Sequence, residues 1–479
     1  MWRWLNNTLE EFQTCFSNRR AWAWFVVVIM GMMLGTEHMG VTSIVRTLSL
    51  NAAAYKCLIH FFRAESYQLS LIEWKWQTLL SKLPILFRIN GRAVMVGDGV
   101  KQSKEGRFMP GVKKLKQESE NSGKGEYISG HMFGGVGILL GDTFRKMYCV
   151  LISLRIHDGL SAINAWWKDE SYEEGSHVEK TIHDAGRASH IFGDSLLLLD
   201  RLFLTNPMLN ALAQYPLIQV VTKAKKNAKA YYPPVPKKGP GRKAEVGPEV
   251  KVLSLFESMA AAFVTIEAQL YGIEQKVSCY CVDLLWGDKL KATDKRQTLR
   301  FVLVWLDGVQ SILASTDLTL SAQDIIELYC YRFKIECAFR EFKQVIAGFC
   351  YRFWSKHMPK LSRFKANDIQ QQKLADIKDD TARICIRNTI EAIEGFALFG
   401  CIALGLLQII SIMFSHCFLG TVVRFMRTPS KAIPSEATVA DFMRKNLFRL
   451  FQLSPDLPIT KIISERQDPR NDEVIGFVA

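Results

Sequence analysis

Between residues 92 and 222, short apolar runs alternate with stretches of helical periodicity, and this alternation restricts the fold more than any other feature of the chain. Strand candidates lie at 92–97, 127–140, 144–156, 195–199 and 217–222, and helix candidates at 176–192 and 207–213. Apolar runs of this length, bounded by Gly and Asp, are typical of buried strands. Their alternation with helices predicts an α/β fold built on a mixed sheet.

The rest of the chain divides by composition. Trp, Leu and Phe recur at helical spacing through residues 1–90, and helical texture returns after residue 350. Residues 223–248 contain five prolines, which exclude a continuous helix, and residues 300–315 predict a hairpin with an Asp307-Gly308 turn. The expected organisation is a helical region at 1–90, an α/β domain at 91–222, a β-rich insertion with a basic Pro/Gly loop at 223–299, the second part of the α/β domain at 300–350, and a helical region at 351–479.

The charge of the chain favours a polyanionic partner. Its 479 residues include 61 Lys+Arg against 47 Asp+Glu, a net charge of +14. The basic residues are clustered, because residues 101–124 hold seven Lys/Arg and residues 223–243 hold eight. Clusters of this kind predict contacts with the phosphates of a nucleic acid.

Two apolar runs leave a membrane protein as an alternative. Residues 21–34 are short for a membrane span, and residues 396–414 approach spanning length but contain Gln408 and Ser411. We expect both runs to be buried helices of a large soluble protein with no membrane partner. The eleven cysteines lack the spacing of a zinc site or a disulfide framework, which favours reduced thiols in the cytoplasm.

The sequence YCYRFKIECAFREFK places Tyr329, Arg332, Glu336 and Lys343 at the spacing Y-(2)-R-(3)-E-(6)-K. On one α-helix these offsets put the four side chains within roughly a 60° arc. Such a stripe is a poor core face, but it suits a carboxylate that holds a metal ion beside groups that bind phosphates. The alternative is a solvated helix face that carries i,i+4 charge pairs.

Asp98 and Asp200 each end a predicted strand. If these strands are neighbours in one sheet, their carboxylates lie together, and a helix packed across the sheet can add Glu336. Three carboxylates on separate elements suit one or two Mg²⁺ ions, which can activate a water or a 3′-hydroxyl for phosphodiester chemistry. Simpler alternatives are a turn role for Asp98 and an ion pair between Asp200 and Arg201.

These motifs resemble those of DDE transposases of bacterial insertion sequences, in the cut-and-paste subgroup with the Y-(2)-R-(3)-E-(6)-K signature. The signature is met in full, and the regions GDGVKQSKEGRFMPGVKKLK and LLLLDRLF around the two aspartates are also similar to that group. The resemblance spans residues 90–350. It implies an RNase H-like catalytic domain with a mixed sheet, interrupted by a β-rich insertion and flanked by N- and C-terminal helical regions.

The same resemblance implies Mg²⁺-dependent cleavage and strand transfer of double-stranded DNA, with Mn²⁺ able to substitute. Asp98, Asp200 and Glu336 are then both the catalytic residues and the metal ligands, and Tyr329, Arg332 and Lys343 contact DNA phosphates. The implied partners are the terminal inverted repeats of the element and its target DNA, bound by a homodimer in the synaptic complex, at the nucleoid in the cytoplasm.

Further DNA contacts are predicted from the residues themselves. The basic residues after Asp98 can follow the DNA backbone: Lys101, Lys104, Arg107, Lys113, Lys114 and Lys116. Trp286 can stack on a displaced base. The alternatives are a solvated loop for the basic residues and a packed hairpin residue for Trp286. Two other functions stay open, a metal-dependent nuclease without strand transfer and a DNA-binding protein that has lost catalysis.

Overall fold

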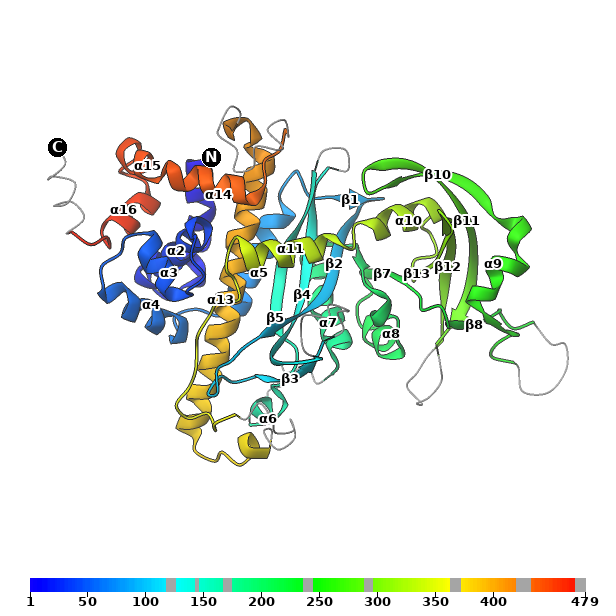
Figure 1. The fold of residues 1–479 in the computed structure, drawn as a ribbon, viewed down its shortest axis with the longest axis horizontal. Coiled ribbons are helices and arrows are strands. Elements are labelled where there is room, and N and C mark those ends of the chain that lie inside the picture. The colour runs from blue at the N-terminus through cyan, green and yellow to red at the C-terminus, as the bar shows by residue number, and fades with distance from the viewer. Residues whose placement is uncertain are drawn as a thin grey trace.

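The computed structural model describes residues 1–117, 126–142, 146–166, 175–235, 244–287, 296–361, 372–418 and 432–469. Over these residues the protein has a mixed α/β fold with one large mixed sheet (Figure 1). The N-terminal helices (blue) and the last helices (red) lie together at one end of the molecule, and the second half of the sheet lies at the other end. Part of the predicted basic loop, residues 236–243, lies outside the described residues.

Five strands form the first half of the sheet, in the order β5-β4-β2-β6-β7. They are β2 (Arg92–Ser103), β4 (Tyr127–Asp142), β5 (Lys146–Ile156), β6 (Ser195–Leu198) and β7 (Ile218–Lys223). β4 is antiparallel to both β2 and β5, whereas β6 is parallel to both β2 and β7. All five strands were predicted from their apolar runs, and the mixed sheet is confirmed.

The sheet continues without a break into a second set of antiparallel strands. β13 (Val309–Ser315) pairs with β7, and β12 (Gln297–Leu306), β11 (Ile273–Trp286) and β10 (Val264–Leu270) follow in that order. The predicted turn between β12 and β13 is confirmed. Asp307 and Gly308 adopt φ values of 48° and 76°, which is the left-handed geometry that a two-residue hairpin turn needs.

Shorter elements complete the described fold. The strands are β1 (Arg88–Ile89), β3 (Lys113–Lys116), β8 (Lys229–Tyr231) and β9 (Glu249–Lys251), and the helices are α6 (Ser161–Asn164), α8 (Asn206–Leu212) and α9 (Leu255–Ser258). The N-terminal helices are α1 (Trp2–Glu10), α2 (Arg19–Leu34), α3 (Val41–Thr47), α4 (Ala53–Arg63) and α5 (Leu69–Ser81). The C-terminal helices are α13 (Asp380–Met413), α14 (Glu436–Lys445), α15 (Leu447–Leu453) and α16 (Pro458–Ser464).

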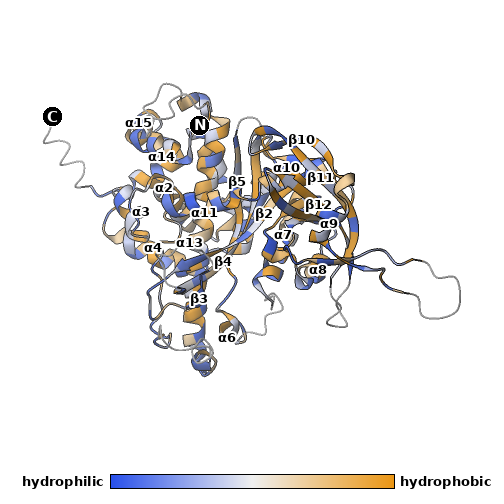
Figure 2. Cartoon of the chain, turned by 45° about the vertical axis from the view of Figure 1, so that its right-hand side comes forward, coloured by the Kyte–Doolittle hydropathy of each residue, from blue (hydrophilic) through white to orange (hydrophobic). Residues whose placement is uncertain are grey.

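The two apolar runs form core helices. α2 packs against α13, and α13 lies along β5, so both runs are enclosed by the sheet and the other helices. Among the described residues, α13 is the one helix long and apolar enough to cross a membrane, and 89% of its most apolar window is buried inside the protein. Hydrophobic residues (orange) are gathered along the helices beside the sheet (Figure 2). This burial is compatible with a soluble protein.

Helices cover both faces of the first half of the sheet. On one face lies α7 (His177–Phe192), which begins with a capping box between Ser176 and Glu179. On the other face lies α11 (Lys334–Gln344), which contacts β2 and β5. Side chains alternate between the two faces along a strand. A Cβ built on Gly99 would therefore meet α7, and one built on Gly135 would meet Phe339 of α11.

Candidate active site

Asp98, Asp200 and Lys223 lie level with one another across three parallel strands. Val96 of β2 pairs with Leu198 of β6, and Leu198 pairs with Val221 of β7. Asp98, Asp200 and Lys223 each follow one of these three paired residues by two positions in the chain. The carboxyl ends of neighbouring parallel strands meet at one edge of a sheet, so the two aspartates and the lysine are brought together there.

The prediction that Asp98 ends its strand is wrong. β2 continues through Asp98 to Ser103, because β4 remains paired with it as far as Gly130. Only the parallel pairing with β6 ends before Asp98. Asp98 therefore lies on a strand that is still paired with β4 on one side but no longer paired with β6 on the other.

The prediction of one helix for the Y-(2)-R-(3)-E-(6)-K stripe is also wrong. α10 (Ala322–Cys330) ends after Tyr329, α11 begins at Lys334, and residues 331–333 form a tight turn between them. Hydrogen bonds of the i→i+3 type run through this turn, as from Arg332 N–H to Tyr329 O at 3.1 Å. Tertiary packing accompanies this turn, since Phe87 contacts Tyr331, and Tyr271, between β10 and β11, contacts Phe333.

Arg332 in this turn joins the strand to the helix. Its guanidinium contacts Asp98 Oδ2 at 3.5 Å and also pairs with Glu336 one turn later. Burial raises the pKa of Asp98 to about 6, against the lowering effects of the Gly99 N–H and Arg332, and the charges of Glu336 and Asp200 raise it further. The other two predicted carboxylates therefore both act electrostatically on Asp98.

The donor set fits a divalent cation, although no metal cluster is formed in the described part of the chain. There, no group of three or more His, Cys, Asp or Glu side chains converges closely enough to hold a metal ion. Instead, a positive guanidinium lies between Asp98 and Glu336. Carboxylate oxygens are the ligands that Mg²⁺ prefers, and here two half-buried aspartates and one exposed glutamate supply them. Asp98, Asp200 and Glu336 are the residues that would hold it.

Tyr329 and Lys343 differ in their relation to the carboxylates. Tyr329 is half-buried, and burial raises its pKa well above the usual range, with Arg332 and Asp200 acting on it in opposite directions. It therefore belongs to the cluster. Lys343 is exposed two turns after Glu336 on α11, and its ammonium lies 5.9 Å from the ring centre of Phe349.

The six basic residues predicted to follow DNA lie on β2, β3 and the loop that joins them. Three of them are exposed: Arg107, Lys114 and Lys116. Lys101 is half-buried, and its ammonium donates to the carbonyl of Lys116 at 2.8 Å. Lys113 is also half-buried and pairs with Asp158 at 2.6 Å.

The prediction that Lys104 contacts DNA is wrong. Its ammonium points inward, donates to the carbonyls of Phe349 and Tyr351, and lies 3.6 Å from the ring centre of Tyr351. Burial lowers its pKa to about 8. Its hydrogen-bonding capacity is used inside the protein, so we remove Lys104 from the DNA-contacting set.

Trp286 is not placed beside the carboxylates. It is the last residue of β11, where it pairs with Gln297 of β12. β13, β12 and β11 follow β7 in the sheet, so β11 lies four strand spacings from β6. At about 4.8 Å per spacing this is roughly 19 Å along the sheet from the strand that precedes Asp200.

A basic groove beside Asp200 contains residues that were not predicted individually. A cavity of about 430 Å³ is lined by Arg201, Lys223, Lys225 and Lys226 together with apolar and neutral residues. Burial and the charge of Arg201 lower the pKa of Lys223, and Asp200 opposes them. The composition of residues 223–243 indicated a phosphate-binding stretch, but the strand pairing that places it against Asp200 is not legible in the sequence.

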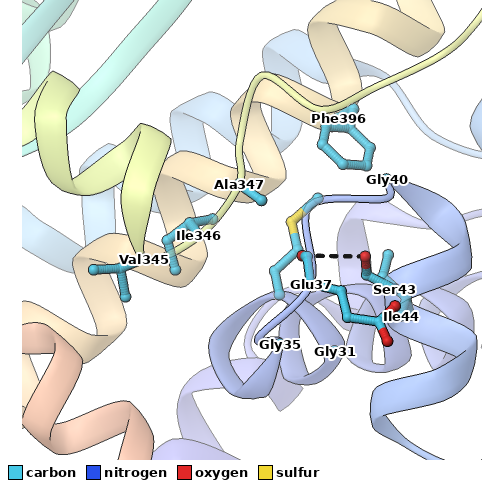
Figure 3. A pocket seen from close by; sticks show the side chains of 11 residues that line it. Gly31, Gly35, Glu37, Gly40, Ser43, Ile44, Val345, Ile346, Ala347 and Phe396 are labelled. Atoms are coloured by element: carbon cyan, nitrogen blue, oxygen red, sulfur yellow. Dashed lines mark hydrogen bonds between the residues drawn. The ribbon is translucent and has the colours of Figure 1, made fainter.

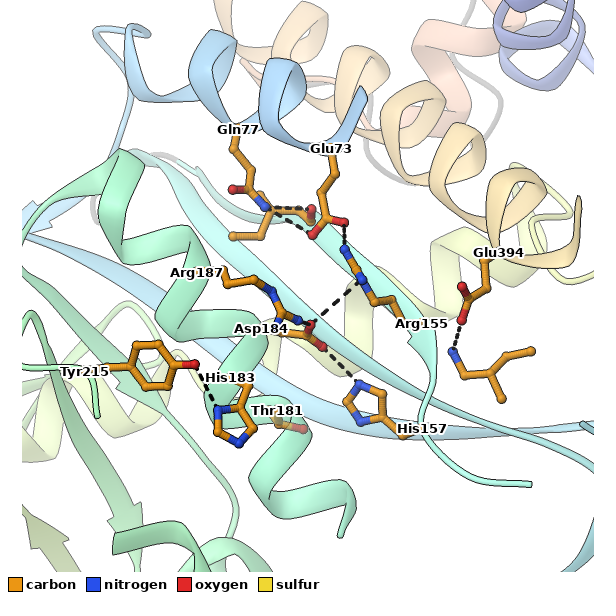
Figure 4. Close-up of polar contacts among 12 residues, drawn as sticks. Glu73, Gln77, Arg155, His157, Thr181, His183, Asp184, Arg187, Tyr215 and Glu394 are labelled. Carbon is orange, nitrogen blue, oxygen red and sulfur yellow. Dashed lines mark hydrogen bonds and ion pairs between the residues drawn. The ribbon is translucent and has the colours of Figure 1, made fainter. Parts of the chain in front are cut away.

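A buried polar network lies on the α7 side of the sheet (Figure 4). Arg155 of β5 contacts Glu73 of α5 at 2.5 Å and Asp184 of α7 at 3.9 Å. Glu394 of α13 accepts from the Ile156 N–H at 2.9 Å, and burial raises its pKa to about 7. The network ties both helical regions to the sheet, and no sequence signal predicted it.

A second cavity lies between α2, α3 and residues 345–347 (Figure 3). Ser43 spans its edge by donating to the Glu37 carbonyl at 3.1 Å. Its volume of about 10 Å³ is enough for at most one water. It is a packing gap and does not extend the candidate active site.

No model of a known protein family matches the chain, and no curated protein matches it. Its assignment therefore rests on the residues and their geometry.

Proposed function

We propose that this chain is a DDE transposase of a bacterial insertion sequence, which binds terminal inverted repeats and catalyses DNA strand cleavage and strand transfer. One observation carries the proposal. Asp98 on β2 and Asp200 just after β6 lie level on neighbouring segments, and Glu336 of α11 shares the partner Arg332 with Asp98. The alternative, a solvated helix face that carries only charge pairs, does not explain why Asp98 and Asp200 lie together beside it.

The topology supports an RNase H-like catalytic domain. That domain is expected to have three antiparallel strands followed by two parallel ones, with helices on both faces of the sheet. Here β2, β4 and β5 are the antiparallel strands, β6 and β7 are the parallel ones, and β2 is at the centre. The strands β8 to β11 lie within residues 223–299, between Asp200 and Glu336 in the chain, where we expect the β-rich insertion.

Each group has a part in the proposed reaction. Mg²⁺ held by Asp98, Asp200 and Glu336 would supply activation of a water or 3′-hydroxyl and stabilisation of the leaving oxygen. Arg332 supplies a planar, bidentate donor for the scissile phosphate. Lys223 and its neighbours in the basic groove bind the adjoining DNA backbone. The partners are then the element's ends and its target DNA, with two copies of the chain in the synaptic complex.

The proposal is tested on labelled duplexes taken from the DNA that flanks the gene, where inverted repeats define the ends. We expect cleavage with Mg²⁺ or Mn²⁺, none with EDTA, and none with Glu336→Gln. Joining of the cut end to a plasmid identifies a transposase. Cleavage without joining would identify a nuclease instead, and binding without cleavage a DNA-binding protein that has lost catalysis.

The basic groove gives a separate prediction. Replacing Lys223 by Gln is expected to weaken binding to all DNA sequences, because the contact is to phosphate. The slope of log affinity against log salt should become shallower by about 1. Fluorescence-anisotropy titrations at several salt concentrations measure it. Lys461→Gln on α16, a lysine paired with Asp456 at the far end of the molecule, is the control. An unchanged slope for Lys223→Gln would remove it from the phosphate contacts.

A further inference from the structure

A chain of hydrogen bonds runs behind the carboxylate-bearing strands, on the α7 face of the sheet. Asp184 of α7 contacts His157 Nε2 at 3.0 Å, and His157 Nδ1 lies 2.9 Å from Nδ1 of His177 at the start of α7. Asp184 and His157 are both buried, and His177 is half-buried. None of these three residues belongs to the site described above.

The chemistry of the partners sets the direction of the bond between His157 and Asp184. Burial acts to raise the pKa of Asp184, but His157, Arg155 and Arg187 outweigh it and hold the pKa well below the usual range. The carboxylate is therefore an acceptor, and His157 donates from Nε2. The bond between His157 Nδ1 and His177 Nδ1 joins one donor to one acceptor, according to the tautomers of the two rings. This leaves the Nε2 edge of His177 facing the sheet.

Two glycines let the imidazoles touch the backbone of the sheet. Gly99 of β2 pairs with Gly134 of β4. A Cβ on Gly99 would lie 2.7 Å from His177 Nε2, and a Cβ on Gly134 would lie 2.0 Å from His157 Nδ1. Both distances are shorter than a van der Waals contact, so the rings occupy a notch that only glycine leaves open. The same Gly99 donates its N–H to Asp98 Oδ1 at 2.7 Å.

His177 also contacts the segment that follows the second aspartate. Its ring lies edge-on to Phe203, with centroids 5.4 Å apart, and Phe203 belongs to the 3-10 helix Arg201–Phe203 directly after Asp200. One imidazole therefore rests against Gly99, next to Asp98, and against the turn that carries Asp200. Asp184, held by two arginines, fixes the other end of the chain.

We propose that the chain Asp184–His157–His177 is a positioning device that sets the separation and orientation of Asp98 and Asp200 for metal binding. This inference rests on the proposed function. The two histidines lie on the face of the sheet opposite the Asp98 carboxylate, so the chain acts through the Gly99 backbone and Phe203. They are positioning residues and not catalytic ones.

The test compares two replacements of His157 in the full-length chain without DNA. Leu fills similar space but makes no hydrogen bond, whereas the Gln amide can donate to Asp184 and can also form a hydrogen bond with His177. Titration with Mn²⁺, followed by electron paramagnetic resonance, measures metal affinity directly. We expect the Kd for Mn²⁺ to rise roughly tenfold for His157→Leu and to return toward wild type for His157→Gln. The rate of DNA cleavage should follow the same order.

A matched control lies on α7, the helix that carries His177 and Asp184. His183 is buried and bonded to Tyr215 at 2.9 Å, and the structure places it on the side of α7 that faces Tyr215. His183→Phe removes a comparable hydrogen bond and should leave Mn²⁺ affinity unchanged. If His157→Leu does not fold, His177→Phe keeps the ring beside Phe203 and loses only the bond to His157. It should then show the weakened affinity.

The outcomes separate the two claims. If the wild-type chain shows no Mn²⁺ binding that depends on Asp98, the proposed function is overturned, and this inference with it. If His157→Leu folds and binds Mn²⁺ as tightly as wild type, only the positioning role is overturned. The same holds for His177→Phe where it takes the place of His157→Leu. A Gln variant as weak as the Leu variant would also overturn it, because the hydrogen-bond chain would then have no part in the effect.

Discussion

Asp98→Asn is expected to abolish DNA cleavage and, in the same protein, to raise the stability of the metal-free fold. Loss of a metal-ligand carboxylate should lower the cleavage rate by roughly a thousandfold or more. The stability gain has a different origin. Burial and the charges of Glu336 and Asp200 raise the pKa of Asp98 to about 6 from an ordinary 3.8, despite Arg332. The ionised carboxylate at neutral pH is therefore held at a cost.

The sign of the pH dependence follows. The folded-state pKa exceeds the unfolded one, so the folded protein binds more protons between pH 3.8 and about 6. Stability of the metal-free protein therefore falls as pH rises through this window and stays low above it. The difference corresponds to about 2–3 kcal/mol, which Asn recovers at pH 7.5.

Chemical denaturation at pH 7.5 in EDTA and cleavage assays in Mg²⁺ measure the two effects. The control is Asp194→Asn, an exposed aspartate just before β6 and away from the carboxylate end of that strand. It should change neither quantity. If Asp98→Asn cleaves within tenfold of wild type, Asp98 is not a metal ligand. If it is less stable than wild type, the electrostatic cost assigned to this carboxylate is wrong.

Asp184→Ala is expected to lower the free energy of unfolding by about 3–5 kcal/mol, because it removes a buried carboxylate that bonds to His157 and to two arginines at once. The Asp184 side chain is 2% exposed and contacts His157, Arg155 and Arg187. Although burial favours its neutral form, these partners depress its pKa. Its contribution is therefore present above pH 3.8 and is lost as pH falls below that value.

The matched control is Asp158→Ala, which removes an ion pair with Lys113 whose aspartate is 46% exposed. Exposed pairs contribute about 0–1 kcal/mol, so this variant should stay close to wild type. Denaturant midpoints at pH 7 and at pH 3 compare the variants. A cost for Asp184→Ala no larger than that of Asp158→Ala would show that the buried network contributes little to stability.

Several elements could be predicted because their cause is local. The strands β4 and β5 follow from apolar runs, the β12–β13 turn from Asp307-Gly308, and the start of α10 from the Ser321–Asp324 capping box. In each case the deciding interactions join residues close together in the chain. Hydrophobic pattern and turn chemistry suffice there.

The sequence predictions were wrong where contacts between segments far apart in the chain determine the local structure. The stripe from Tyr329 to Lys343 satisfies helical spacing, yet Phe87 and Tyr271, far away in the chain, pack against its middle and accompany a tight turn there. Lys104 resembles a surface lysine in composition, but two carbonyls from residues 349 and 351 draw its ammonium inward. Neither contact leaves a trace in the local pattern.

By itself, the sequence determined the α/β class, the strands that carry the site and the three carboxylates that we assign to it, since apolar periodicity and residue chemistry are properties of short segments. The tertiary structure alone decided that Asp98, Asp200 and Lys223 stand level, that Arg332 joins Asp98 to Glu336, and that His177 rests behind the aspartates. Strand register and the direction of buried side chains are set by packing between segments far apart in the chain, and no local pattern encodes them.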